Sequence, residues 1–291
     1  MQLNTGFIGL GAMGQGMARN LQRHGLLTGV WNRSSDKAVA LAHELAVKAA
    51  TSPAELAAQC DVVVLCVSAD ADVLQMIDAI LPSARPGLTV IDCSTVAAAT
   101  AQTAAQRLAQ AGAAFLDCPV SGGVEGAKNG TLAIMCGGDA ATFAAAQPVL
   151  KAMGQTITHM GPTGFGQAAK ATNQILCAGV IQAVAEAMAF AKAHQLPLPQ
   201  LIETLGKGAG SSWYFVHRAP FMANAAFPAG FKVRLHDKDL RICQDMAAQH
   251  QVQLSVIEST RQAYQTLMQQ GFGDEDISSL FRLKDALFAR G

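Results

Sequence analysis

Residues 6–21 read GFIGLGAMGQGMARNL and constrain the fold more than any other stretch of the chain. A short apolar run leads into glycines spaced as GxGxxG, and a helix-forming run follows at once. In this order of strand, turn and helix, Gly9 permits the tight turn, Gly11 lets a pyrophosphate approach the backbone, and Gly14 lets the helix pack close to the strand. Unsatisfied N–H groups and the helix dipole favour a phosphate at such a helix start. The segment predicts a dinucleotide-binding turn made of Gly9, Leu10, Gly11, Ala12, Met13 and Gly14; the alternative is a glycine turn that only closes a strand–helix corner.

The first 160 residues alternate short apolar runs with helical runs. The apolar runs are continuous rather than alternating, which predicts a parallel sheet covered on both faces, the doubly wound α/β arrangement. Strands are expected at 4–9, 27–32, 61–67, 88–93, 113–117, 131–136 and 156–160. Helices are expected at 12–24, 34–45, 53–59, 71–81, 96–111 and 141–152.

From about residue 166 onward the chain shows helical periodicity alone. Helices are expected at 166–194, 199–206, 211–223, 235–250, 254–270 and 276–288. The run 166–194 is apolar almost all round, and a membrane span is disfavoured because Gln174, Gln182 and Glu186 interrupt it. A helix that is apolar on every side must be buried on every side. We therefore expect this helix to join two domains and to pack against a second subunit, in a homodimer or homotetramer.

The predicted fold class is α/β, with an N-terminal doubly wound (Rossmann) domain at 1–163 and an all-helical domain at 164–291. Composition argues against a nucleic-acid partner, because the formal net charge is zero and the chain has no run of basic residues. The seven cysteines are scattered, without metal-ligand spacing, which indicates reduced core residues, no metal site and a cytoplasmic protein. The N-terminus lacks the basic region of a signal peptide, and no membrane association is expected.

The residues after the second predicted strand indicate which dinucleotide is bound. An NAD-binding domain places a carboxylate there to hold the ribose 2′-hydroxyl, but this chain has Asn32 followed by Arg33 and Ser34. An arginine beside a hydroxyl and a helix start suits a 2′-phosphate. The sequence therefore favours NADP, with NAD possible; the alternative is a plain helix N-cap with a solvated arginine.

Residues 117–127, DCPVSGGVEGA, offer a candidate site for a substrate carboxylate. Pro119 fixes the backbone, and Ser121, Gly122 and Gly123 present a hydroxyl and successive unhindered N–H groups, a concavity that can hold an anion. On the local sequence alone, a surface turn is the competing interpretation.

Residues 161–174, GPTGFGQAAKATNQ, offer a candidate for proton transfer. Lys170 and Asn173 are three apart, so on a helix they share a face. Alanines surround Lys170, and desolvation there would lower the pKa of its ammonium and suit it to acid–base work. The alternative is a lysine whose stem packs while its ammonium reaches water. Further along, Trp213 and Phe231 are candidates for lining a substrate pocket or for helical core.

Together these segments resemble the β-hydroxyacid dehydrogenase family, which includes 3-hydroxyisobutyrate dehydrogenase and tartronate semialdehyde reductase. FIGLGAMGQGMARNL is similar to the family's cofactor signature, and DCPVSGG to its substrate-binding DAPVSGG with Cys118 in place of alanine. GFGQAAKATNQ resembles its catalytic helix GxGxxxKxxNx, and KDL at 238–240 resembles its C-terminal motif. The four motifs occur in order across essentially the whole chain, which makes the resemblance more specific than any single motif.

The resemblance implies reversible hydride transfer between NADP(H) and a small hydroxyacid or semialdehyde. Lys170 would be the catalytic acid/base, Asn173 would orient the substrate, and the Ser121–Gly123 loop would hold its carboxylate. The cofactor would be contacted by Val67, Ser68, Thr95 and Lys238.

Two other functions stay open. An imine reductase shares the fold but usually replaces the lysine, so Lys170 argues against it. A non-catalytic NADP-binding scaffold is opposed by the intact lysine, asparagine and SGG loop. The related 6-phosphogluconate dehydrogenases are much longer and carry a histidine where this chain has Thr172, which sets that activity aside.

Overall fold

The computed structural model describes residues 3–289, and the chain divides into two units at 1–170 and 171–291. The predicted boundary lay at residue 163. The first turn of the long helix belongs by its contacts to the N-terminal unit, because Gly164 and Gln167 are hydrogen-bonded to Asp117 in that unit. Each unit is described below by itself.

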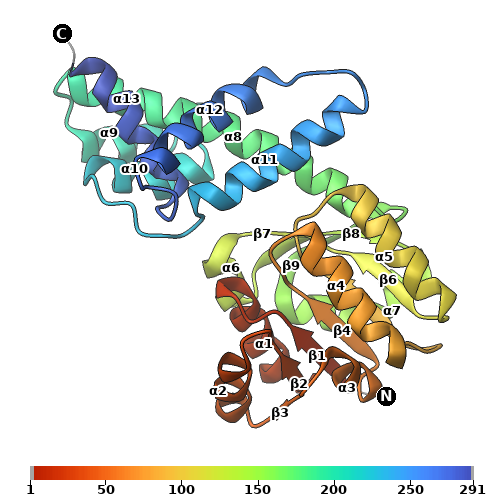
Figure 1. Cartoon of the computed structure of the whole chain (residues 1–291). Coiled ribbons are helices and arrows are strands. Elements are labelled where there is room, and N and C mark those ends of the chain that lie inside the picture. The colour runs from red at the N-terminus through yellow and green to blue at the C-terminus, as the bar shows by residue number, and fades with distance from the viewer. Residues whose placement is uncertain (1–2, 290–291) are drawn as a thin grey trace. The chain divides into compact units, whose positions relative to one another are not determined.

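Within the described residues, the N-terminal unit is built on a nine-stranded sheet (Figure 1). Its strands are β1 (Thr5–Ile8), β2 (Leu27–Trp31), β3 (Lys48–Ala49), β4 (Val62–Leu65), β5 (Thr89–Asp92), β6 (Ala114–Asp117), β7 (Val120–Ser121), β8 (Leu132–Gly138) and β9 (Gly154–Gly161). The order β3-β2-β1-β4-β5-β6 is parallel throughout and is the strand order of a dinucleotide-binding Rossmann domain.

Helices cover both faces of this sheet, as the continuous apolar strands predict. They are α1 (Ala12–Arg23), α2 (Ser35–Leu45), α3 (Pro53–Ala58), α4 (Asp70–Ile80), η1 (Leu81–Ser83), α5 (Ala98–Gln110), α6 (Gly123–Asn129) and α7 (Ala140–Met153). Phe7 and Val64 pack with residues of α1, α2 and α7 in one apolar cluster, whereas Ile8 and Val63 pack with α3, α4 and α5 in another. Successive strand residues therefore enter opposite cores, and both faces of the sheet are covered by apolar packing.

The far part of the sheet departs from the all-parallel expectation. Strand β8 runs antiparallel to β6 and β7, with Leu116 opposite Gly138 and Val120 opposite Ile134, and β9 is parallel to β8. The apolar pattern of a strand that is buried on both faces does not depend on the direction of the strand, so the sequence could not show that β8 is antiparallel. The short elements β3, β7 and α6 were also not expected, because two-residue strands and a glycine-containing turn of helix leave no periodic signal.

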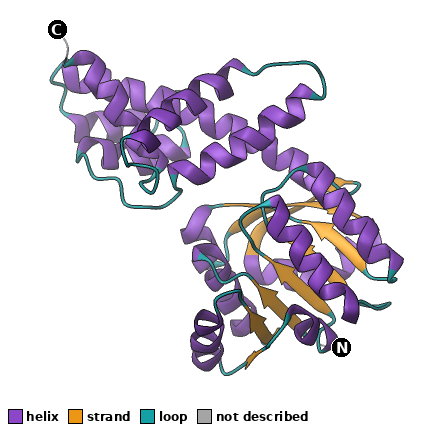
Figure 2. Ribbon diagram, viewed as in Figure 1, coloured by secondary structure: helices purple, strands orange, loops and turns teal. Residues whose placement is uncertain are grey.

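The C-terminal unit is helical throughout its described residues, as predicted (Figure 2). Its helices are α8 (Phe165–Ala193), which begins in the N-terminal unit, α9 (Leu198–Leu205), α10 (Trp213–Ala223), α11 (Val233–Ala248), α12 (Ser255–Gln269), η2 (Ile277–Leu280) and α13 (Phe281–Phe288). One apolar cluster joins α8, α10, α11, α12 and α13, with Ile181, Met188, Leu240, Tyr264 and Leu280 fully or almost fully buried.

Helix α8 is long and apolar enough to meet the length and composition of a membrane span. One face of it packs into the helical core at Ala178, Ile181, Ala185 and Met188. Fewer than half of its residues are buried, and Phe165, Leu176 and Phe190 are more than half exposed.

The start of α8 is attached to the sheet by a buried carboxylate. Asp117, the last residue of β6, is fully buried and accepts hydrogen bonds from the backbone N–H groups of Gly164 at 2.8 Å and Gln167 at 2.9 Å. These N–H groups belong to the helix start, where intrahelical partners are missing and the dipole favours an anion. Burial raises the pKa of the Asp117 carboxyl, and the surrounding backbone donors act in the opposite direction.

Replacing Asp117 by asparagine tests this anchor. The substitution keeps the shape but turns one accepting oxygen into a donor that faces a backbone N–H, leaving a buried donor unsatisfied. We expect Asp117→Asn to lower the free energy of unfolding by about 1–3 kcal/mol, measured by urea denaturation. Asp139→Asn is the matched control: Asp139 accepts from the Thr142 N–H at the exposed start of α7, where asparagine caps as well as aspartate. Equal losses in the two variants would contradict the anchor.

Candidate functional site

The glycine turn between β1 and α1 has the geometry that a dinucleotide needs. Gly9 has a φ of +97°, which favours glycine, and a Cβ on Gly14 would overlap the Gly9 carbonyl oxygen. A Cβ on Gly11 would meet nothing within 4 Å. Gly9 and Gly14 are therefore required by the fold itself, whereas Gly11 leaves space next to the backbone that a bound group can occupy.

The start of α1 fits an anion. Its N-cap residue Gly11 provides no side-chain hydrogen bond, and the first turn carries no acidic residue. Among the described helices, α3, α7 and α10 are capped by the side chains of Ser52, Asp139 and Ser212. Helix α1 thus begins with N–H groups that no side-chain cap satisfies, as expected for a phosphate-binding helix.

Asn32 braces the glycine turn. Its Oδ1 accepts from the Leu10 N–H at 2.9 Å, and its Nδ2 donates to the Ser34 carbonyl at 3.2 Å. Arg33 is mostly exposed, with 79% of its side chain accessible, and forms an ion pair with Asp72 of α4 at 3.3 Å. Ser34 is the N-cap of α2 and makes no side-chain capping bond. A guanidinium, a hydroxyl and a helix start therefore lie together after β2.

The ends of β4 and β5 are joined to the start of α8 through two side chains. The Val67 N–H donates to the Ser94 hydroxyl at 2.9 Å. Gln167, which is 1% exposed, donates its amide to the Ser94 carbonyl at 2.9 Å and accepts from the Val96 N–H at 3.1 Å. This pair of bonds spans Thr95. Ser68, also predicted to contact the cofactor, lies exposed one residue beyond Val67.

Lys170 is on α8 three residues beyond Gln167, and only 7% of it is exposed. Residues three apart share a face of a helix, so the Gln167 clamp places Lys170 close to the segment that contains Thr95. Asn173 follows one turn later and is half-buried. The structure therefore brings the predicted acid/base and the predicted ribose contact to the same edge of the sheet.

The Ser121–Gly123 loop lies between β7 and α6. Ser121 pairs with Ala133 of β8, whereas Gly122 and Gly123 are exposed. Helix α6, which follows the loop, is docked on α1 because Asn20 of α1 donates to the Ala127 carbonyl at 2.7 Å. The Ser121–Gly123 loop and the glycine turn thus belong to one packed assembly.

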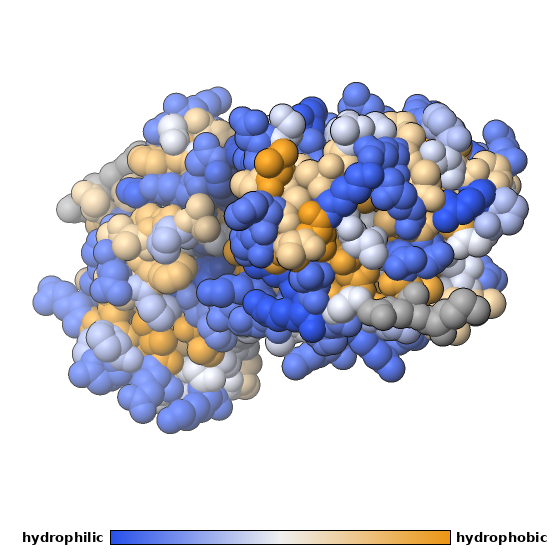
Figure 3. All heavy atoms as spheres, turned by 90° about the horizontal axis from the view of Figure 1, so that it is seen from below, coloured by the Kyte–Doolittle hydropathy of each residue, from blue (hydrophilic) through white to orange (hydrophobic). Residues whose placement is uncertain are grey.

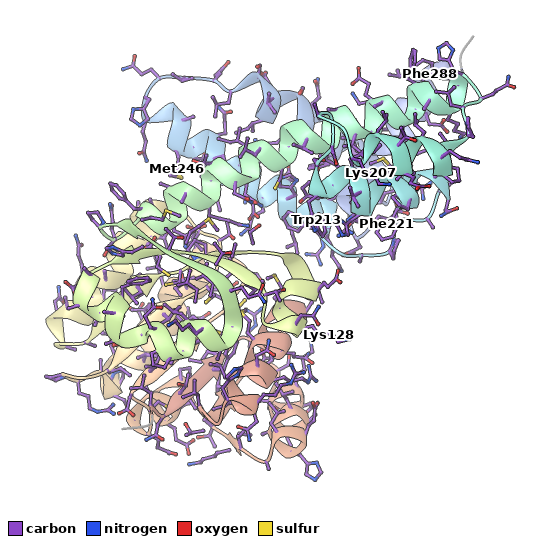
Figure 4. The ribbon with its side chains drawn as sticks, turned by 180° about the vertical axis from the view of Figure 1, so that it is seen from behind. Lys128, Lys207, Trp213, Phe221, Met246 and Phe288 are labelled. Atoms are coloured by element: carbon purple, nitrogen blue, oxygen red, sulfur yellow. The ribbon has the colours of Figure 1, made fainter. Side chains whose placement is uncertain are left out.

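Three more predicted residues lie in the helical unit. Trp213 begins α10 and is 50% exposed (Figure 4), stacked on His217 with ring centroids 4.3 Å apart. Arg218 lies 5.0 Å from the centroid of the Trp213 ring and forms an ion pair with Asp276 at 3.2 Å. The same aspartate accepts from the Phe231 N–H at 2.9 Å, whereas the Phe231 ring lies against His236, with ring centroids 5.1 Å apart.

Lys238 lies on α11, where its ammonium is 3.0 Å from the carboxylate of Asp239. Asp239 in turn accepts from Gln174 of α8 at 2.7 Å. Lys238 and Asn173, the residue before Gln174, are therefore connected inside the helical unit.

Four residues of this arrangement were not predicted as functional: Asp117, Gln167, Gln174 and Asp239. A usable signal existed for two of them, because Gln167 and Gln174 are amides in an otherwise apolar helix and are spaced by two turns. Their partners lie far away in the chain, and sequence alone gave no means of finding them.

Comparison with known proteins identifies the family. Residues 4–161 match the family model described as the NAD binding domain of 6-phosphogluconate dehydrogenase. Residues 164–284 match the one described as NAD-binding of NADP-dependent 3-hydroxyisobutyrate dehydrogenase. The chain belongs to the β-hydroxyacid dehydrogenase family.

Relatives of this family match over most or all of their length. An uncharacterized oxidoreductase of Synechocystis is 44% identical over 82% of this chain and 84% of its own. The NAD-dependent L-serine dehydrogenase of Pseudomonas aeruginosa is 35% identical over 96% and 97%. The structure of Mycobacterium tuberculosis 3-hydroxyisobutyrate dehydrogenase with L-serine superposes with a TM-score of 0.87 at 31% identity, covering 97% of this chain and 99% of that one. Solved imine reductases, at about 20% identity, share the fold alone.

This β-hydroxyacid dehydrogenase is accordingly an oxidoreductase that acts on CH–OH groups with a nicotinamide dinucleotide. The turn at Gly9–Gly14 and the uncapped start of α1 fit the dinucleotide's pyrophosphate. When bound, the nicotinamide ring supplies or accepts the hydride.

Two glycine substitutions separate cofactor binding from folding. Gly11→Ala should fold normally, because its φ of −72° suits alanine and its Cβ meets nothing, yet the methyl group would crowd the pyrophosphate. We expect NADPH to bind roughly tenfold more weakly, a cost of about 1.4 kcal/mol, measured by fluorescence titration.

Gly14→Ala is the contrasting variant, since its methyl group overlaps the Gly9 carbonyl. It should lower the melting temperature of the protein without any cofactor present. If Gly11→Ala bound NADPH as tightly as the wild type, the assignment of this turn to the pyrophosphate would be wrong.

Proposed function

We propose that this protein transfers hydride reversibly between NADP(H) and a small semialdehyde or hydroxyacid that carries a carboxylate, with Lys170 as the general acid and base. The observation that supports this most strongly is the burial of Lys170 on a helix turn that Gln167 ties to the segment around Thr95. An amine in that place can serve the oxygen whose carbon exchanges hydride with the nicotinamide.

In the reducing direction, the Lys170 ammonium donates a proton to the oxygen of the substrate carbonyl as that oxygen gains charge. In the oxidising direction, the neutral amine accepts the hydroxyl proton. Asn173 orients the substrate, and the hydroxyl and N–H groups of Ser121, Gly122 and Gly123 hold the carboxylate. Trp213 and Phe231 limit the size of the substrate.

The preference for NADP rests on the segment after β2. No carboxylate follows this strand at Asn32–Arg33–Ser34, and the Arg33 guanidinium is mostly exposed. A 2′-phosphate would replace Asp72 as the partner of Arg33 and receive the N–H groups at the start of α2. Val67, Ser68 and Lys238 make the remaining proposed cofactor contacts.

We also infer a homodimer or homotetramer that works in the cytoplasm. Leu176 and Phe190 are exposed apolar residues of α8, and a second subunit would cover them. On the face shown in Figure 3, apolar residues lie in patches between hydrophilic ones. The seven cysteines are scattered along the chain without paired spacing, which suits a reducing compartment.

Substrate class and acid–base role are tested together. The enzyme is assayed with NADPH and one candidate substrate at a time: tartronate semialdehyde, methylmalonate semialdehyde, succinic semialdehyde, glyoxylate or a cyclic imine. Oxidation of NADPH is followed by absorbance at 340 nm. We expect turnover of at least one semialdehyde or glyoxylate and none of the imine. Lys170→Ala should lower kcat by ~10² to 10⁴-fold with nearly unchanged NADPH affinity.

Lys151→Ala is the control for the lysine, because Lys151 is an exposed residue of α7. It should keep the activity of the wild type. Wild-type turnover of the imine alone would refute the proposed substrate class, and a Lys170→Ala variant with most of its kcat would refute the acid–base role.

The role of Arg33 is tested by cofactor preference. Arg33→Ala should lower kcat/KM for NADPH by about tenfold or more and leave NADH unaffected, because a charge-assisted bond to the phosphate is lost. Arg107→Ala is the matched control, an arginine of α5 that pairs with Asp78 at 2.7 Å. Equal wild-type efficiency with NADH and NADPH would contradict the preference.

A further inference from the structure

Gln174 is a polar residue buried between two helices of the C-terminal unit. It is 1% exposed on α8, and both ends of its amide are engaged. Its Nε2 donates to the carboxylate of Asp239 at 2.7 Å, and its Oε1 accepts from Nδ2 of Asn173 at 2.8 Å. A carboxylate accepts and cannot donate, so the orientation of the Gln174 amide is set by Asp239, and its oxygen must face Asn173.

The chain of contacts continues to Lys238. Asp239 is 5% exposed, and its other oxygen lies 3.0 Å from the Lys238 ammonium. Consecutive helix residues do not normally face each other, so the lysine side chain has to fold back over α11 to make this pair. One series of polar contacts, called the bridge below, thus links α8 to α11 through Asn173, Gln174, Asp239 and Lys238.

Two further hydrogen bonds join the backbone of α8 to side chains of α11 beside the bridge. His236 of α11 is fully buried, with Nε2 3.3 Å from the Gln174 carbonyl and Nδ1 3.0 Å from the Tyr264 hydroxyl. The Cys243 thiol donates to the Ala171 carbonyl at 3.4 Å. Helices α8 and α11 are therefore pinned where the bridge crosses, and its side chains have little freedom to find other partners.

The bridge determines which atom Asn173 presents. Its Nδ2 donates to Gln174 and also to the thiol of Cys177, at 3.5 Å. Both amide hydrogens are then in use, and the carbonyl oxygen is the atom that Asn173 offers to a substrate. An oxygen presented in this way can only accept a hydrogen bond, so it can orient a donor group of the substrate other than the hydroxyl that Lys170 deprotonates, or the Lys170 ammonium one turn earlier.

We propose that Gln174 is a positioning residue that fixes the amide of Asn173 and, through Asp239, the ammonium of Lys238, without itself touching substrate or cofactor. This inference rests on the proposed function, in which Asn173 orients substrate and Lys238 contacts cofactor. Gln174 then couples the two: disturbing it alters kcat through Asn173 and cofactor affinity through Lys238.

A reciprocal exchange tests the bridge. Gln174→Glu sets two carboxylates against each other in a buried place. Asp239→Asn leaves one oxygen for two donors, so its NH2 faces either the Gln174 amide or the Lys238 ammonium. In the double variant the new amide at position 239 donates to the new carboxylate at position 174, and its oxygen still accepts from Lys238. We expect each single variant to lose about tenfold or more in kcat/KM and the double variant to return to within about threefold of the wild type.

The readouts separate positioning from folding. kcat, KM, the NADPH dissociation constant and the melting temperature are measured for every variant, with assays well below the lowest melting temperature. Gln182→Glu is the matched control, since Gln182 lies further along α8 and donates to the Thr260 hydroxyl at 3.3 Å; it should stay within about twofold of the wild type. Gln174→Met, of similar volume and without charge, replaces a single variant that fails to fold.

Singles that match the wild type, or a folded double variant no better than the worse single, would overturn the proposal. The proposal would also be overturned if the loss of kcat/KM in each variant only paralleled its loss of melting temperature. If the wild type reduced none of the semialdehydes or glyoxylate, the proposed function would fail separately. The bridge would then be judged by NADPH affinity, which should weaken in the singles and recover in the double.

Discussion

The bond between the Asp117 carboxylate and the first N–H groups of α8 is the interaction on which the rest of the structure depends. It joins the last parallel strand of the Rossmann order to the longest helix, at the one point of that helix where backbone donors lack intrahelical partners. The buried anion and the helix dipole reinforce each other and hold the first turn of α8 against the sheet. Lys170 lies on the next turn of that helix, within the same unit.

Two buried glutamines of α8 then hold this helix at two points. Gln167 ties its first turns to the end of β5, and Gln174, two turns later, ties it to α11 in the helical unit. Lys170 and Asn173 lie between them. An amide suits this task because it donates at one end and accepts at the other, so it can join two polar groups in a buried place without adding a charge. The segment of α8 that carries Lys170 and Asn173 is thereby held at both ends by buried amides.

Much of the fold could be predicted because strands that are buried on both faces, such as DVVVLCV, are continuously apolar, and because helical segments show a helical period. The reversal of β8 could not, since apolar patterning carries no strand direction. The candidate site was reached through glycines and a lysine in recognisable spacing. Gln174 and Asp239 escaped because their bond joins residues 65 positions apart, and nothing near either one in the chain signals the other.

The sequence by itself determined the classes of structure and chemistry: a dinucleotide turn, a doubly wound sheet, an all-helical second half and a lysine on an apolar helix. These follow from local rules, because glycine φ angles, helical period and side-chain chemistry are read over a few neighbouring residues. Only the tertiary structure decided which way β8 runs, that Asn32 braces the glycine turn, and that Asn173 presents its oxygen. Those features depend on hydrogen bonds between distant segments, whose partners are chosen by packing of the whole unit rather than by the sequence around them.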